Sequence, residues 1–241
     1  MLEVFDLAVA LIRTQARTFL RLWLLLVVPP TIVLGAASAA LEGAPVLAVV
    51  PVLLAPLLQA PAVLLGGRLL FADHVPVREV LRELWQRKLA WLGAWAVLGL
   101  AAVVGCGVLS WATLAAVTFL QEATLLERSG PARGFRRSMN LGGSNPGISV
   151  TSVITWTVLT AWGAVVGEAT GQAVVAGILQ LGEPFGQAME GRATPYLLWG
   201  MLAVQPVYGI YHVLLYVDAR TRVEGWDLQV GLMAAAAEGR R

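Results

Sequence analysis

Four long apolar stretches, separated by short polar segments, dominate the chain. They cover residues 22–41, 46–70, 89–120 and 148–217. A helix that crosses a bilayer needs about 20 apolar residues, so each of the first two stretches predicts one pass. The polar segment GEPFGQAMEGRATP at 182–195 divides the last stretch into passes at about 148–167 and 196–217. The pattern is therefore typical of a protein that crosses a membrane several times.

The third stretch is too long for one pass and short for two. As one helix, its 32 residues would be about 48 Å long, against an apolar core of about 30 Å. With a turn at Gly105 and Gly107, each half has about 15 residues, which fits a tight or re-entrant hairpin. Hydropathy alone leaves both arrangements open.

The positions of the basic residues favour the hairpin. If 89–120 returns to the side from which it entered, sixteen of the seventeen basic residues lie on one side and only Arg192 on the other. If it crosses once, the division is nine to eight. Because basic residues accumulate on the cytoplasmic side of membrane proteins, we predict about six membrane segments, of which the third and fourth form a Gly-hinged hairpin, with both termini cytoplasmic.

Three shorter segments have apolar side chains on one helix face and arginines on another: residues 2–20, 77–88 and 131–141. Each precedes a membrane segment, and such helices lie in the headgroup layer, where they attract anionic lipid. The predicted fold class is all-α, a polytopic membrane bundle with three amphipathic interfacial helices on the cytoplasmic side.

We predict one integral membrane domain over 1–241. It divides into possible units 1–70, 71–126 and 127–217, followed by a cytoplasmic tail at 218–241. The units share little sequence, so a structured repeat and a chance succession of basic connectors explain the division equally well.

Composition supports the membrane assignment and argues against several other functions. Apolar residues make up 58% of the chain and charged residues 13%, whereas soluble domains carry about 25% charge. The basic residues form short runs beside apolar segments rather than a basic domain, so we expect no nucleic acid partner. The single cysteine, Cys106, excludes an intrachain disulfide and a multi-cysteine metal site.

Candidate chemistry is sparse. The chain has no HExxH, GxSxG, phosphate loop or dinucleotide fingerprint. His74 and His212, with Asp73 and Asp218, could supply a metal site near the cytoplasmic boundary, but their spacing matches no ligand motif. We therefore predict no catalytic residue, no metal and no cofactor.

Two amides lie near the middle of predicted passes, each close to a proline: Gln59 near Pro61, and Gln205 before Pro206. This placement predicts a polar contact between Gln59 and Gln205 inside the membrane. The contact could be a substrate or gating site, or it could join helices at about 1 kcal/mol, and the second role is the more frequent.

A stripe of glycines predicts a close approach of two helices. Gly163, Gly167 and Gly171 follow one another at a spacing of four in GAVVGEATG, which leaves room for a neighbouring backbone. Glu168 lies on the same segment near the outer boundary. It could line a pore, but an ordinary interfacial acid is favoured because no second acid or histidine accompanies it.

Two stretches, QEATLLERSGPARGFRRSMNL at 121–141 and LLYVDARTRVEGWDLQ at 214–229, resemble a family of bacterial six-helix membrane proteins. The family includes the YciC-like proteins and the membrane domain attached to some glycerophosphodiester phosphodiesterases. The resemblance implies a six-helix bundle in the bacterial cytoplasmic (inner) membrane. The chain contains no phosphodiesterase domain, so that activity is not implied.

The charges of these two stretches alternate in sign, and we predict that the stretches are neighbours. The expected cytoplasmic ion-pair network comprises Glu122, Glu127, Arg136, Arg137, Asp218, Arg220, Arg222 and Glu224. A surface ion pair contributes about 0–1 kcal/mol, but a network at the membrane boundary could fix the angle between helices.

The sequence favours a non-catalytic scaffold, regulatory or accessory subunit of an envelope or membrane complex. Its expected partners are the lipid bilayer, anionic headgroups, and another membrane protein or a second copy of the chain. The alternative is a transporter or permease subunit for a small hydrophobic or lipid-like solute. A polar cavity joining Gln59, Gln205 and Glu168 would favour transport, a closed bundle with an apolar groove would favour a scaffold, and His74, His212 and Asp218 around a metal would favour an enzyme.

Overall fold

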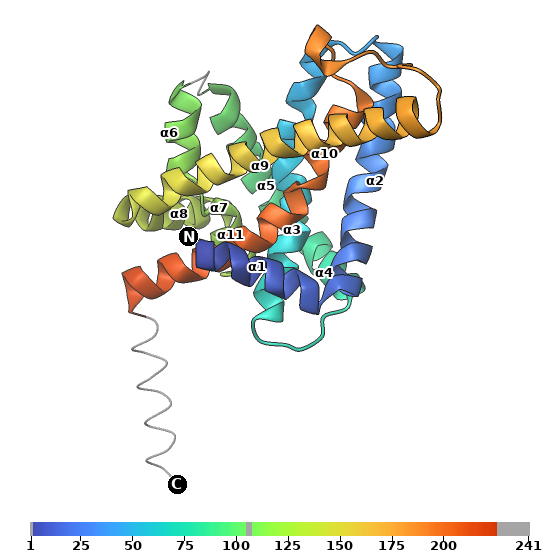
Figure 1. Ribbon diagram of the computed structural model, residues 1–241. Helices are drawn as coiled ribbons and strands as arrows, with labels where there is room; N and C mark the ends of the chain where they lie inside the picture. Colours follow the sequence, from blue (N-terminus) through green and yellow to red (C-terminus); the bar gives the residue numbers. More distant parts are fainter. Residues whose placement is uncertain (1, 105–107, 226–241) are drawn as a thin grey trace, which may run out of the picture.

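The computed structural model describes residues 2–104 and 108–225, and all regular structure in these ranges is helical (Figure 1). Within these ranges, four helical segments are long and apolar enough to cross a membrane: Ala16–Ala40, Pro45–Leu69, Pro146–Ile178 and Pro195–Val223. They contain α2 (Ala16–Ala40), α3 (Val49–Leu69), α9 (Pro146–Gln172), α10 (Pro195–Ala203) and α11 (Gln205–Glu224). The predicted all-α class and multi-pass membrane character are confirmed.

The segment predicted to form a hairpin is a pair of helices, α5 (Lys88–Val104) and α6 (Val108–Ala116), which pack against each other (Figure 1). At 1.5 Å per residue α5 is about 26 Å long and α6 about 14 Å. Neither fills an apolar core of about 30 Å. Arg87, just before α5, donates to the carbonyl oxygen of Leu125, so the chain returns close to where the hairpin began. The predicted hinge at Gly105 and Gly107 lies outside the described residues, as does Cys106.

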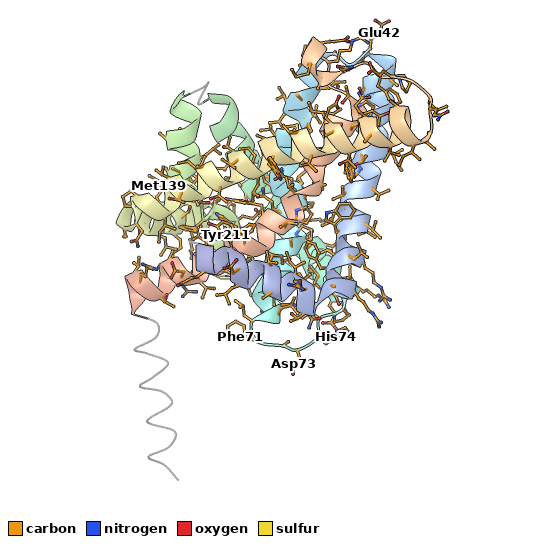
Figure 2. All side chains as sticks on the ribbon, in the orientation of Figure 1. Glu42, Phe71, Asp73, His74, Met139 and Tyr211 are labelled. Atoms are coloured by element: carbon orange, nitrogen blue, oxygen red, sulfur yellow. The ribbon has the colours of Figure 1, made fainter. Side chains whose placement is uncertain are left out.

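The bundle has two ends, each tied by a hydrogen bond between loops. At one end the amide of Ala193 donates to the carbonyl oxygen of Gly43 at 2.8 Å. At the other, the side chain of Gln15 donates to the carbonyl oxygen of Asp73, also at 2.8 Å. Figure 2 shows Glu42 at the first end and Asp73 at the second. We call these the Glu42 end and the Asp73 end.

Basic side chains gather at the Asp73 end. Arg68 on α3 and Arg87 both pair with Glu83 on α4 (Val77–Gln86). Glu127, which follows α7 (Leu120–Leu125), pairs with Arg137 on α8 (Pro131–Ser144) and with Arg220 on α11. Arg192, by contrast, packs against Gly43 at the Glu42 end. Arg192, the one basic residue predicted on the other side, thus lies at the opposite end of the bundle from these ion pairs.

The amphipathic helix predicted at 2–20 is shorter than predicted, whereas the one predicted at 131–141 turns its apolar stripe outward, as a helix in the headgroup layer would. The first, α1 (Leu2–Thr14), ends six residues earlier than predicted and packs on α11, where the rings of Phe5 and Tyr211 are 5.9 Å apart. In α8 the predicted apolar stripe is exposed at Phe135 and Met139, while Gly134 and Ser138 are buried. Small residues face inward because α8 lies close to α7: a Cβ on Gly134 would be 2.5 Å from the Thr124 hydroxyl oxygen.

The glycine stripe of α9 packs directly on the backbone of α10. A Cβ on Gly163 would lie 2.5 Å from the carbonyl oxygen of Gly200, and one on Gly167 would lie 2.5 Å from that of Tyr196. A Cβ on Gly171 would meet the Tyr196 ring at 2.3 Å. All three predicted glycines therefore lie at one helix contact. Gly200 completes it from α10, since a Cβ there would be 2.0 Å from the carbonyl oxygen of Gly163.

Candidate functional site in an intramembrane cavity

The short helix α7 lies wholly inside the bundle. All six of its residues are buried, including Gln121, Glu122 and Thr124. Helix α6 ends at Ala116 and a turn at 117–119 redirects the chain inward. A segment predicted to leave the membrane is thus part of the core, and it carries polar side chains into an apolar environment.

Glu122 is paired with His212 and not with the surface arginines. Glu122 Oε1 and His212 Nδ1 are 2.6 Å apart, and the side chains are 0% and 7% exposed. Glu122 Oε2 is also buried and has no hydrogen-bond partner among the described residues. A carboxyl group in an apolar interior requires a hydrogen-bonded partner, which α11 supplies. The prediction that Glu122 belongs to the cytoplasmic ion-pair network is wrong, because the hairpin directs α7 into the core.

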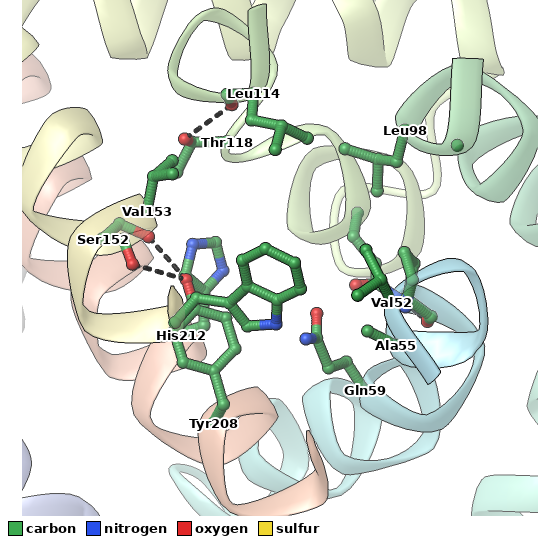
Figure 3. A pocket seen from close by; sticks show the side chains of 14 residues that line it. Val52, Ala55, Gln59, Leu98, Leu114, Thr118, Ser152, Val153, Tyr208 and His212 are labelled. Atoms are coloured by element: carbon green, nitrogen blue, oxygen red, sulfur yellow. Dashed lines mark hydrogen bonds between the residues drawn. The ribbon is translucent and has the colours of Figure 1, made fainter. Parts of the chain in front are cut away.

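His212 contributes to the wall of a partly open cavity of about 80 Å³ between α3, the α5–α7 segment, α9 and α11 (Figure 3). Apolar side chains form much of the wall: Val52, Ala55, Leu98, Leu114 and Val153. The polar side chains in the wall are Gln59, Thr118, Gln121, Ser152, Trp156, Tyr208 and His212. The cavity therefore combines apolar surface with a few hydrogen-bonding groups, as small-molecule sites do.

Several of these polar groups are held in fixed positions. The hydroxyl groups of Tyr208 and Ser152 are 2.7 Å apart (Figure 3), and the Gln121 side chain donates to the carbonyl oxygen of Pro56 at 2.6 Å. The ring of Tyr208 lies 5.2 Å from the His212 ring, which also contacts Phe119 at 5.5 Å. The imidazole is thus fixed by two aromatic rings and one carboxyl group.

The amides of Gln59 and Gln205 are in contact but have different surroundings. Gln59 Nε2 donates to Gln205 Oε1 at 2.9 Å. Gln205 also accepts from Trp156 Nε1 at 3.0 Å, and donates to the Thr160 hydroxyl at 3.2 Å and the Met201 carbonyl at 2.8 Å. Gln205 is fully buried and joins α11 to α3, α9 and α10, whereas Gln59 lines the cavity (Figure 3).

Glu168 lies at the Glu42 end and not at the cavity. Its carboxylate accepts from the amide of Ala188 at 3.0 Å, from Gln172 Nε2 at 3.2 Å and from the Thr194 hydroxyl. It therefore fixes the loop between α9 and α10 onto α9. The polar cavity joining Gln59, Gln205 and Glu168, named above as the feature that would favour transport, is therefore not found among the described residues. The observed cavity has Gln59 in its wall together with His212.

Glu127 is the centre of the ion-pair network at the Asp73 end. It binds Arg137 at 3.2 Å and Arg220 at 3.5 Å, and it accepts from the Tyr216 hydroxyl. These contacts place the two family-like stretches side by side, as predicted. Of the other proposed members, Arg222 and Asp218 pair within α11 at 3.0 Å, Arg136 is exposed, and the side chain of Glu224 lies outside the described part.

The two histidines occupy different environments. His74 is exposed in the loop after α3 at the Asp73 end (Figure 2), whereas His212 is buried against Glu122. Within residues 2–104 and 108–225, no group of three or more His, Cys, Asp or Glu side chains could hold a metal. Asp218, the third residue considered for such a site, is paired with Arg222.

Comparison of the chain with protein-family models, with curated proteins and with solved structures found no match. The resemblance to the YciC-like family therefore rests on the two sequence stretches alone. The described structure defines a helical, multi-pass membrane protein with a cavity inside its bundle.

Proposed function

We propose that this protein binds a small, mostly apolar solute with a hydrogen-bonding group, as a transporter or permease subunit. The observation that carries the proposal is the buried Glu122–His212 pair, of which His212 lines the cavity. Ionisable side chains inside a membrane are costly and commonly mark the path of a ligand or ion. The pair lies in the interior and does not hold the segments at either end of the bundle together. The other ion pairs of the described residues lie at those ends.

The groups at the wall indicate how such a solute would bind. Glu122 occupies His212 Nδ1, so Nε2 is the ring nitrogen left for a ligand. A carboxyl group behind an imidazole also fixes its orientation and tautomer. The amide of Gln59 offers a second polar contact, and the apolar wall suits a hydrocarbon surface. The cavity, at about 80 Å³, is smaller than the pockets of about 300–1,000 Å³ that enclose whole drug-sized ligands, so it would hold the head of a larger, lipid-like solute.

The role as a scaffold, which the sequence favoured, has weaker support. It rests on the exposed apolar surface of segments such as Ala16–Ala40 and Pro146–Ile178, whose most apolar 18 residues are only 22% and 28% buried. Lipid alone would cover such faces without a protein partner. We place the protein in the bacterial inner membrane with the Asp73 end in the cytoplasm, on the basis of the basic residues there and of the family resemblance.

The proposal contains no catalytic step. Ser152, His212 and Glu122 are the residue types of a hydrolytic triad, but such a triad needs the nucleophile bonded to its base. The Ser152 hydroxyl is bonded to Tyr208 instead. We therefore expect no labelling by a fluorophosphonate probe. Labelling of the wild type that disappears in both Ser152→Ala and His212→Ala would contradict the proposal and indicate a hydrolase instead.

A glycine in the cavity wall allows a matched test. Gly99 lines the cavity, and a Cβ there would meet nothing within 4 Å. Gly99→Phe should therefore fill the cavity without a backbone clash. Gly177 has equally open surroundings away from the cavity, so Gly177→Phe is the control. Each variant is purified from native membranes in mild detergent, and its extractable small molecules are identified by mass spectrometry.

We expect one class of small molecule to copurify with the wild type and with Gly177→Phe, and to be lost from Gly99→Phe. His212→Gln should also lose it, while size-exclusion profiles show that each variant remains folded. Solute binding would be contradicted if the two phenylalanine variants retained the small molecule equally, or if the wild type copurified with nothing but bulk lipid. Either result would leave the scaffold role.

A further inference from the structure

Two adjoining cavities at the Asp73 end form a second site, separate from the one lined by His212. One, of about 380 Å³, has Leu64, Leu70, Phe71, Leu126 and Val217 among its lining side chains. The other, of about 570 Å³, is lined by charged and polar side chains alone. The two share Arg68, Glu83, Arg87 and Arg128. We call them together the basic groove, since arginines stand where its apolar and polar halves meet.

The basic groove has more positive than negative side chains. Its lining contains Arg68, Arg82, Arg87, Arg128 and Arg220, against Glu79, Glu83 and Glu127. Glu83 alone faces three guanidinium groups, at 2.5 Å from Arg68, 2.5 Å from Arg87 and 3.8 Å from Arg128. Burial lowers the pKa of the Arg87 guanidinium, although the negative charge of Glu83 acts to raise it. The positive charges of Arg128 and Arg68 lower this pKa further. An anionic ligand would balance this excess.

Arg128 is the guanidinium most available to a ligand. Its side chain is 76% exposed, and its contact with Glu83 is the longest of the three. Its backbone has φ of 54°, a left-handed conformation that costs a non-glycine residue energy and recurs at ligand sites. Arg128 therefore offers an exposed guanidinium whose ion pair with Glu83 is longer, and more easily given up, than those of Arg68 and Arg87.

The apolar half lies where acyl chains would be. Arg68 stands in the last turn of the segment Pro45–Leu69, one of the four that could cross a membrane. Its guanidinium is therefore at headgroup level, with Leu64 one turn deeper. Phe71 is 80% exposed and Leu70 is 38% exposed, which is costly in water but suits a membrane interface.

We infer that the basic groove binds one anionic glycerophospholipid, with its phosphate between Arg128, Arg87 and Arg68 and an acyl chain along Leu64, Leu70 and Phe71. Guanidinium groups suit phosphate because they donate in pairs. The division of one groove into a charged and an apolar half matches an amphipathic ligand better than inorganic phosphate. This site does not depend on solute binding in the His212 cavity.

The test uses the full-length protein, delipidated in mild detergent and examined by native mass spectrometry. Phosphatidylglycerol and phosphatidylcholine with identical acyl chains are added separately. We expect one phosphatidylglycerol to bind at least about tenfold more tightly, because each arginine near the surface contributes about a fivefold preference for an anionic lipid. Arg128→Gln should lower the preference about fivefold.

Two controls distinguish lipid binding in the basic groove from non-specific electrostatic attraction to the protein surface. Arg136→Gln removes the same charge from an exposed site on α8 that does not line the groove, and should leave the preference unchanged. Phe71→Ser should weaken the binding of both lipids, whereas Leu89→Ser, at the same 80% exposure on α5, should leave the binding of both unchanged. An equal effect of Arg128→Gln and Arg136→Gln would overturn the inference. Displacement of the lipid by equimolar glycerol phosphate would also overturn it, in favour of a soluble phosphate ester.

Discussion

Glu122 Oε1 and His212 Nδ1 are 2.6 Å apart in the interior of the bundle, and the contact joins α7 to α11. The two residues are 90 positions apart in the chain. Their pairing depends on the return of the α5–α6 hairpin, which directs α7 inward. The contact thus links the hairpin to the helix that carries Tyr208 and His212 into the cavity wall.

Replacing one member of this pair should cost more than replacing both. Glu122→Leu leaves the His212 imidazole without a partner, and His212→Phe does the same to the Glu122 carboxyl group. Losing one partner of a buried pair typically costs about 3–5 kcal/mol, whereas replacing both by apolar groups is often neutral. We therefore expect the double variant to be more stable than either single variant, measured as free energy of unfolding in detergent. Additive losses would contradict the coupling.

The two paired amides should differ in their effect on stability. Gln205→Leu removes bonds to Gln59, Trp156, Thr160 and Met201, whereas Gln59→Leu removes the bond to Gln205. Interhelical hydrogen bonds in membranes contribute about 0.6–2 kcal/mol each. Gln205→Leu should therefore lower the free energy of unfolding by about 2 kcal/mol more than Gln59→Leu. The reverse order would show that the cavity residue matters more to the fold.

Features with a local signature could be predicted from the sequence. The membrane segments follow from runs of apolar residues, and the hairpin from the distribution of basic residues. The glycine spacing indicated the contact of α9 with a neighbour, and the prolines drew attention to Gln59 and Gln205. None of these requires knowledge of how distant segments pack.

The candidate site could not be predicted because it depends on tertiary packing. Glu122 is followed within six residues by Glu127 and Arg128, so the segment resembled a surface connector. A signal was present in its neighbours, since Phe119, Leu120, Ala123 and Leu125 are all apolar. Likewise, α8 turns small residues inward because α7 leaves no space for Phe135 or Met139.

The contact between α9 and α10 should tolerate no side chain. Gly200→Ala would place its Cβ 2.0 Å from the carbonyl oxygen of Gly163, and a backbone atom cannot move aside as a side chain end can. Overpacking costs about 1–3 kcal/mol or more, so we expect lower stability and a lower yield of folded protein. Gly177→Ala, which meets nothing within 4 Å, should be within about 1 kcal/mol of the wild type. Equal stability of the two variants would rule out the close contact.

The hairpin arrangement makes an unambiguous prediction for cysteine labelling. In a Cys106→Ser background, single cysteines are placed at Met189 near the Glu42 end, His74 at the Asp73 end and Gly130 between α7 and α8. Met189 is 94% exposed, and His74 and Gly130 are also exposed. With the Asp73 end cytoplasmic, a membrane-impermeant maleimide should label only Met189→Cys in intact cells. Permeabilised cells should show labelling of all three.

The Gly130→Cys variant distinguishes the two possible paths of 89–120. If this segment returns to its starting side, Gly130→Cys must behave like His74→Cys and opposite to Met189→Cys. If it crosses once, Gly130 moves to the outer side, and Met189 joins His74 in the cytoplasm. Labelling of Gly130→Cys but not Met189→Cys in intact cells would therefore overturn the hairpin. It would also be incompatible with the bond that Arg87 makes to Leu125, since those residues would then lie on opposite sides of the membrane.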